Sequence, residues 1–123
     1  LYQMRFGREP GAYAANAFDA LVLLGLALQA AKDPADGAKV RDALRAVATG
    51  GQSYGPAELN DALSALRLGL DVDYRGASGG LDFDAKGNVS GDYIVWRVVR
   101  GATGAAELRN LAQVKGDSLA RLR

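Results

Sequence analysis

The chain has 123 residues, of which 49% are hydrophobic and 24% are charged, and these values are typical of one globular domain. Fifteen basic and 14 acidic residues leave a net charge of +1, so the overall charge gives no reason to expect a nucleic-acid partner or a lipid surface. The sequence contains no cysteine and no histidine, which excludes disulfides, thiol nucleophiles, Ser-His-Asp triads and most zinc sites. We therefore expect no catalytic residue, no metal site and no cofactor, and we do not expect an enzyme.

Two helices are predicted in the first part of the chain. The first covers residues 11–32, where apolar residues recur at helical spacing, and residues 20–28 are apolar on every side. Such a helix is expected to be buried on more than one face, although this run covers less than half of the roughly 20 residues that a membrane span requires. The second covers residues 36–49 as an amphipathic surface helix, which Gly50 and Gly51 end.

A third helix is predicted to begin at Pro56. Gly55 is suited to the N-cap position and Glu58 to the first turn, where the helix dipole favours a carboxylate. Gly69 is expected to end this helix.

Short strands are predicted after the third helix. Residues 81–84 alternate between apolar side chains and aspartates, which is typical of a half-exposed strand, with a turn over residues 84–88. Residues 93–99 are rich in β-branched and aromatic side chains and predict a strand that is covered on both faces. For the tail, residues 104–123, the spacing of leucines suggests a short helix or a frayed end.

This set of elements is expected to be incomplete on its own. Two or three short strands make a poor sheet, and the first helix needs a larger partner surface than the rest of the chain offers. The chain, which starts at Leu1, is therefore expected to be cut from a longer protein that completes its core. By itself it should expose the apolar face of the first helix and an unpaired strand edge, and it should dimerise, swap or aggregate through them.

Three acidic or glycine-rich patterns partly match known kinds of site, namely a calcium loop, a phosphate-binding loop and a pair of catalytic carboxylates. Residues 82–87 begin like a calcium loop, but Lys86 and Tyr93 stand where that loop requires oxygen ligands. Residues 76–80 lack the lysine of a phosphate-binding loop and indicate a glycine-allowed bend. Asp71, Asp73, Asp82 and Asp84 suggest a pair of carboxylates for acid–base catalysis. Asp82 and Asp84, however, are expected on the solvated face of one strand, where nothing apolar would raise a pKa.

Residues 11–16 form the one segment with a plausible binding role. Small residues surround Tyr13 at a helix N-terminus, where backbone N–H groups are unpaired and a polar ligand can approach. Tyr13 could alternatively staple the start of the helix to the core, and the residues alone leave both interpretations open.

Three blocks in order along the chain resemble one protein family. Residues 9–20 are similar to a family stretch that ends in Tyr-Asp-Ala, residues 71–91 resemble its GASG-x-x-DFD-x-x-G block, and residues 93–98 resemble its Y-x-x-W-x-V strand. The family is that of the branched-chain amino-acid-binding proteins, which are type I periplasmic solute-binding proteins of ABC importers. The resemblance covers roughly residues 6–100 and corresponds to the C-terminal third of such proteins.

The resemblance implies an α/β fold with two lobes, of which this chain is a C-terminal segment of helices followed by short strands. Residues 1–93 would belong to the first lobe, with three helices and a β-hairpin, and residues 94–123 would form the third crossover strand and a tail toward the second lobe. Ala12, Tyr13 and Asn16 would line the ligand pocket. A further three residues would form the hinge, namely Ile94, Val95 and Trp96.

The implied function is that of the substrate-binding component of an importer for branched-chain or related amino acids, which captures its ligand by hinge closure. Its partners would be the amino acid and a membrane permease, and its location the periplasm. The alternative is a ligand-sensing domain of the same fold, for amides, urea or aromatic acids, in a regulatory protein. The residues that hold the ligand's carboxylate and ammonium groups lie, in the family, upstream of the part that this chain resembles.

Overall fold

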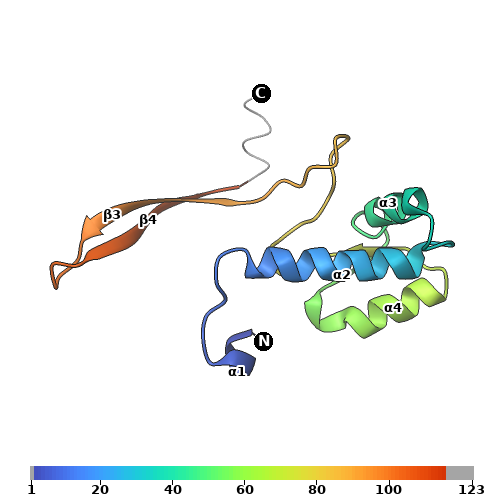
Figure 1. The fold of residues 1–123 in the computed structure, drawn as a ribbon, viewed down its shortest axis with the longest axis horizontal. Helices are drawn as coiled ribbons and strands as arrows, with labels where there is room; N and C mark the ends of the chain where they lie inside the picture. The colour runs from blue at the N-terminus through green and yellow to red at the C-terminus, as the bar shows by residue number, and fades with distance from the viewer. Residues whose placement is uncertain (1, 116–123) are drawn as a thin grey trace. The chain divides into compact units, whose positions relative to one another are not determined.

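A computed structural model describes residues 2–115 of the chain, which divides into two compact units, Leu1–Val89 and Ser90–Arg123 (Figure 1). The first unit contains α1 (Tyr2–Phe6), α2 (Ala14–Ala30), α3 (Gly37–Ala46), β1 (Gln52–Tyr54), the 3-10 helix η1 (Pro56–Glu58), α4 (Leu59–Arg67) and β2 (Val72–Tyr74). The second contains β3 (Tyr93–Arg100) and β4 (Ala106–Val114). The predicted α/β class is therefore confirmed.

The first two predicted helices are present, as α2 and α3. The Asp36 carboxylate caps α3, because it accepts the backbone N–H groups of Ala38 at 2.9 Å and Lys39 at 3.4 Å. Gly50 and Gly51 both have positive φ, but α3 ends earlier than predicted, at Ala46, with Val47 as its C-cap.

The third predicted helix begins as predicted at Pro56. The side chain of Glu58 accepts the N–H of Gly55 at 2.8 Å, which satisfies one donor at the start of the helix. The first turn is the 3-10 helix η1, and the chain then continues as α4 until Gly69, whose φ is 75°.

The first unit also contains a small parallel sheet that the sequence analysis did not predict. Strands β1 and β2 pair in parallel, with Gln52 opposite Val72 and Tyr54 opposite Tyr74. On the other side of β2, the Val47 carbonyl accepts the N–H of Tyr74 at 2.9 Å and ties the end of α3 to the sheet. Each strand has three residues, which is too short for an alternating pattern to be recognised.

The core of the first unit lies between the helices and the parallel sheet, where α3 and α4 each pack against α2 (Figure 1). Leu23 and Leu26 of α2 are buried in this core. Four large apolar side chains of the same helix are exposed, namely Phe18, Leu21, Leu24 and Leu28. Among the described residues α2 is therefore buried on one face only, and its other apolar face is exposed, as expected for this chain by itself.

The predicted half-exposed strand over residues 81–84 is wrong. Phe83 makes a single antiparallel bridge with Val89, and the chain turns between them. The Asp84 carboxylate closes this turn by accepting the N–H groups of Lys86 and Asn88, both at 2.8 Å. Hydrogen bonds from Asn88, from its backbone first, hold the pKa of Asp84 below its ordinary value. Asp84, which the alternating pattern assigned to a strand, is therefore a turn residue.

The second unit is an antiparallel hairpin. The strand predicted over residues 93–99 is confirmed as β3, but both of its faces are exposed among the described residues, and Trp96 is 55% exposed. The helix or frayed end predicted for the tail is wrong up to Val114, because β4 pairs with β3 there, with a bulge opposite Val95 and Trp96. The end of the tail, residues 116–123, lies outside the described residues. Within residues 2–115, no helix is long and apolar enough to cross a membrane.

Candidate functional site

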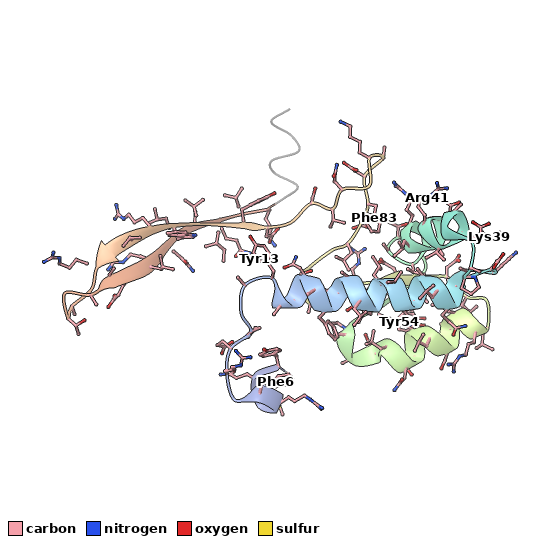
Figure 2. The ribbon with its side chains drawn as sticks, in the orientation of Figure 1. Phe6, Tyr13, Lys39, Arg41, Tyr54 and Phe83 are labelled. Carbon is pink, nitrogen blue, oxygen red and sulfur yellow. The ribbon has the colours of Figure 1, made fainter. Side chains whose placement is uncertain are left out.

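The candidate ligand site is the start of α2, where Tyr13 precedes the first helical turn (Figure 2). Tyr13 has φ 63° and ψ 3°, the left-handed conformation, which is uncommon for a residue with a side chain. Its carbonyl accepts the N–H of Ala17 at 2.9 Å, and its own side chain does not cap the helix. The helix start is therefore fixed by the backbone, and the phenol ring is left free of any capping role.

The three residues predicted to bind a ligand lie together at this helix start and are all exposed. The Tyr13 side chain is 81% exposed, and Ala12 and Asn16 are exposed as well. A staple between Tyr13 and the core is therefore wrong in this chain, because a staple residue would be covered by its partner. The aromatic ring is available to form one wall of a pocket, but these residues do not enclose a ligand.

A buried carboxylate one turn further along α2 connects this helix to the loop after β2. The Asp19 side chain is fully buried and accepts four hydrogen bonds. The donors are the Tyr74 hydroxyl at 2.9 Å, the Ala77 N–H at 2.9 Å, the Ser78 N–H at 2.6 Å and the Ser78 hydroxyl at 2.5 Å. We call these residues, Asp19, Tyr74, Ala77 and Ser78, the Asp19 clasp.

The hydrogen bonds of the Asp19 clasp keep its carboxylate charged. Burial alone would raise the pKa of Asp19, but the donors of Ser78, Ala77 and Tyr74 outweigh it and hold the pKa below the ordinary value. Burial, and the hydrogen bond that its hydroxyl donates to this carboxylate, raise the pKa of Tyr74. At neutral pH the pair is therefore an ionised aspartate and a neutral tyrosine.

The glycine-rich loop over residues 76–80 is a bend, as predicted, and Gly76 and Gly79 bridge its ends. Its N–H groups do hold an anion, but this anion is the chain's own Asp19 carboxylate. A Cβ atom on Gly76 would overlap that carboxylate, which explains a glycine at this position. The role of Asp19 was not predicted from the sequence, although an aspartate in an otherwise apolar stretch of helix indicates a buried carboxylate that needs hydrogen-bond donors.

Two further aspartates, Asp73 and Asp82, flank the same loop and form ion pairs with Arg75. Arg75 contacts Asp73 at 2.8 Å and Asp82 at 3.3 Å, and hydrogen bonding to Asp73 is the main reason why the pKa of Arg75 is raised. Asp73 is buried, and its Oδ1 atom has no hydrogen-bond partner among the described residues. Asp82 is exposed to solvent, as predicted, but it forms an ion pair with Arg75 and does not lie on a strand.

The three predicted hinge residues, Ile94, Val95 and Trp96, are consecutive on β3 and follow closely after the boundary between the two units. All three are about half exposed. Val95 and Trp96 lie opposite the bulge, whose extra residue, Leu111, belongs to β4.

Among residues 2–115, no group of three or more histidine, cysteine, aspartate or glutamate side chains is placed to hold a metal ion. Comparison of the chain with protein families, with curated proteins and with solved structures finds no match.

Proposed function

We propose that this chain is the C-terminal part of the solute-binding component of an ABC importer, and that the complete receptor binds a branched-chain or related amino acid. In this proposal the ligand is captured between two lobes in the periplasm and delivered to a membrane permease. Tyr13 forms a wall of the pocket for the ligand's side chain, Ala12 and Asn16 flank it, and Ile94, Val95 and Trp96 belong to a strand that crosses between the lobes.

The observation that carries the proposal is the Asp19 clasp. The resemblance to the solute-binding family rests chiefly on residues 9–20 and 71–91, which lie far apart in the sequence. Asp19 belongs to the first block, and Ala77 and Ser78 belong to the second. Four hydrogen bonds between the blocks give a physical reason for both patterns to occur in one chain, because each would leave buried polar groups unpaired without the other.

The exposed face of α2 supports the same proposal. Phe18, Leu21, Leu24 and Leu28 leave an apolar stripe on the longest helix, which is unfavourable in water. A segment of a larger receptor that packs on this stripe would give the helix the burial that its composition predicts. The alternative, a regulatory sensor of the same fold, also requires a segment that packs on this stripe. The identity of the ligand distinguishes the importer component from the sensor.

Replacing Tyr13 by alanine in the complete receptor is expected to weaken amino-acid binding by about 1–3 kcal/mol, because the ligand's side chain loses an aromatic wall. Isothermal titration calorimetry measures this change with leucine, isoleucine, valine and phenylalanine as ligands. Binding of amides, urea or aromatic acids in place of these amino acids would favour the regulatory sensor.

The matched control is Phe6→Ala, which removes an exposed aromatic side chain from α1 and is expected to leave the affinity unchanged. Tyr13→Phe keeps the ring and removes only the hydroxyl, so it reports whether the phenol donates to the ligand. Equal affinities of the wild type and Tyr13→Ala would show that Tyr13 is not part of the pocket.

A further inference from the structure

We propose that two copies of this chain associate through the edge of β4 that has no strand partner among residues 2–115, and that this edge pairs with its counterpart in antiparallel orientation about Leu108. The result is a continuous four-stranded sheet in the order β3, β4, β4 of the second copy and β3 of the second copy. The inference rests on the hairpin alone and is independent of the proposed receptor function.

The hairpin has the properties of an incomplete sheet. It consists of two strands, and both faces of β3 and β4 are exposed among the described residues. A two-stranded hairpin is marginal in water without a third strand or a covering layer. Its edge strand β4 has nine residues and no proline, and such an edge offers a row of backbone groups to another strand.

The hydrogen-bonding pattern determines which residues of β4 face the free edge. Gly101 donates its N–H to the carbonyl of Ala105 at 2.8 Å, next to the turn. Because N–H and C=O groups alternate in direction along an antiparallel strand, the backbone groups of Ala106, Leu108 and Asn110 point away from β3. A pairing about Leu108 sets these outward groups opposite one another, with Ala106 opposite the second copy's Asn110.

The charges on β4 select this register. A pairing about Leu108 places Glu107 opposite Arg109 of the second copy, and the symmetry creates this pair twice. The neighbouring symmetric registers, about Glu107 or about Arg109, would place two carboxylates or two guanidiniums opposite each other, which is unfavourable. Within one hairpin Arg97 lies directly opposite Arg109, so the second copy's Glu107 also relieves a repulsion between like charges.

The opposite face of the sheet gains an apolar row. Val98 lies opposite Leu108 in the hairpin, and both are exposed, Leu108 by 67%. In the dimer the two leucines become neighbours, and Val98, Leu108 and their two counterparts form one row across four strands. The edge of β3 offers no such match, since that strand contains two arginines and no acidic residue.

The test is the mass of the 123-residue chain in solution, measured by sedimentation velocity over a range of concentrations. The wild type is expected to shift from 12.9 kDa toward about twice this mass as the concentration rises. Glu107→Arg and Arg109→Glu are each expected to weaken the dimer about tenfold, because each turns two attractions into repulsions. The double variant, which exchanges the two charges, restores opposite charges across the interface and is expected to regain the dimer. Arg5→Glu on α1 is the control and leaves the dimer unchanged.

A second measurement covers the case in which the charge variants disturb the hairpin. Because the chain has no cysteine, Leu108→Cys introduces a single thiol, and the pairing brings the two Cα atoms to about 5.5 Å, within reach of a disulfide. Mild oxidation should cross-link Leu108→Cys as a dimer and leave Thr103→Cys, in the turn, largely uncross-linked. A wild-type chain that stays monomeric up to about 1 mM, or a double charge variant as weak as either single variant, would overturn the proposal.

Discussion

Asp19→Ala is expected to lower the free energy of unfolding of the chain by about 2–4 kcal/mol. The substitution removes the acceptor of four hydrogen bonds and leaves the buried Tyr74 hydroxyl and the Ala77 and Ser78 N–H groups without a partner. Urea unfolding at pH 7, followed by circular dichroism, measures the loss. Asp42→Ala, which removes an exposed carboxylate from α3, serves as the control and should change stability by less than about 0.5 kcal/mol.

The same carboxylate makes stability depend on pH in one direction. The pKa of Asp19 is lower in the folded chain than the ordinary value of about 3.9 in an unfolded one. Its contribution is therefore fully present well above the unfolded-state pKa and is lost as the pH falls through the lower, folded-state pKa. Asp19→Asn should lack this part of the acid dependence, and an unchanged difference in stability between pH 7 and pH 3 would contradict the assigned role.

Gly51→Ala is expected to destabilise the chain by about 3 kcal/mol or more. Gly51 has a φ of 76°, and a Cβ atom there would overlap the backbone carbonyl of Asp71. That carbonyl accepts the N–H of Gln52 at 3.3 Å, so the collision falls where β1 begins to pair with β2.

Gly50 offers a matched control for this substitution. Its φ is 78°, but nothing lies within 4 Å of the position that its Cβ would occupy. Gly50→Ala therefore introduces only the strain of a left-handed residue, about 1 kcal/mol. Thermal unfolding of both variants separates the two effects, and equal melting temperatures would show that the collision at Gly51 is relieved at little cost.

The sequence predicted those elements whose signals are local. The apolar spacing of α2 extends over several turns, and Pro56 marks the next helix start. Gly50 and Gly51 mark the turn after α3, although the helix itself ends at Ala46. The capping contact of Glu58 on Gly55 also follows from their spacing alone. Each of these features depends on residues within a few positions of one another.

The features that the sequence did not predict depend on distant partners. Strands β1 and β2 have three residues each, and each is a strand only because it pairs with the other. In β4, Leu108 and Leu111 have the three-residue spacing that suggested a helix, but pairing with β3 makes this segment a strand. The alternating pattern of residues 81–84 misled for a different, local reason, because Asp84 hydrogen-bonds its own turn.

The candidate site was predicted in part. The position of Tyr13 at a helix start followed from the small residues around it, but its left-handed backbone and its exposure did not. In the Asp19 clasp, Asp19 contacts Ala77 and Ser78, which follow it by 58 and 59 positions in the sequence. Local residue spacing cannot predict such a contact. The same loop was correctly predicted to be a bend, yet the anion that it holds belongs to another element.

The most direct test of the central proposal, that a further part of a receptor completes this core, is the effect of Leu21→Lys on stability in two settings. Leu21 is 72% exposed, so the substitution should change the free energy of unfolding of the 123-residue chain by less than about 0.5 kcal/mol. In the complete receptor it should cost about 2–4 kcal/mol, because the lysine would be buried under the covering segment. Leu23→Lys, at a position buried in both, controls for the chemistry of the change. An equally small effect of Leu21→Lys in the chain and in the longer protein would contradict the proposal.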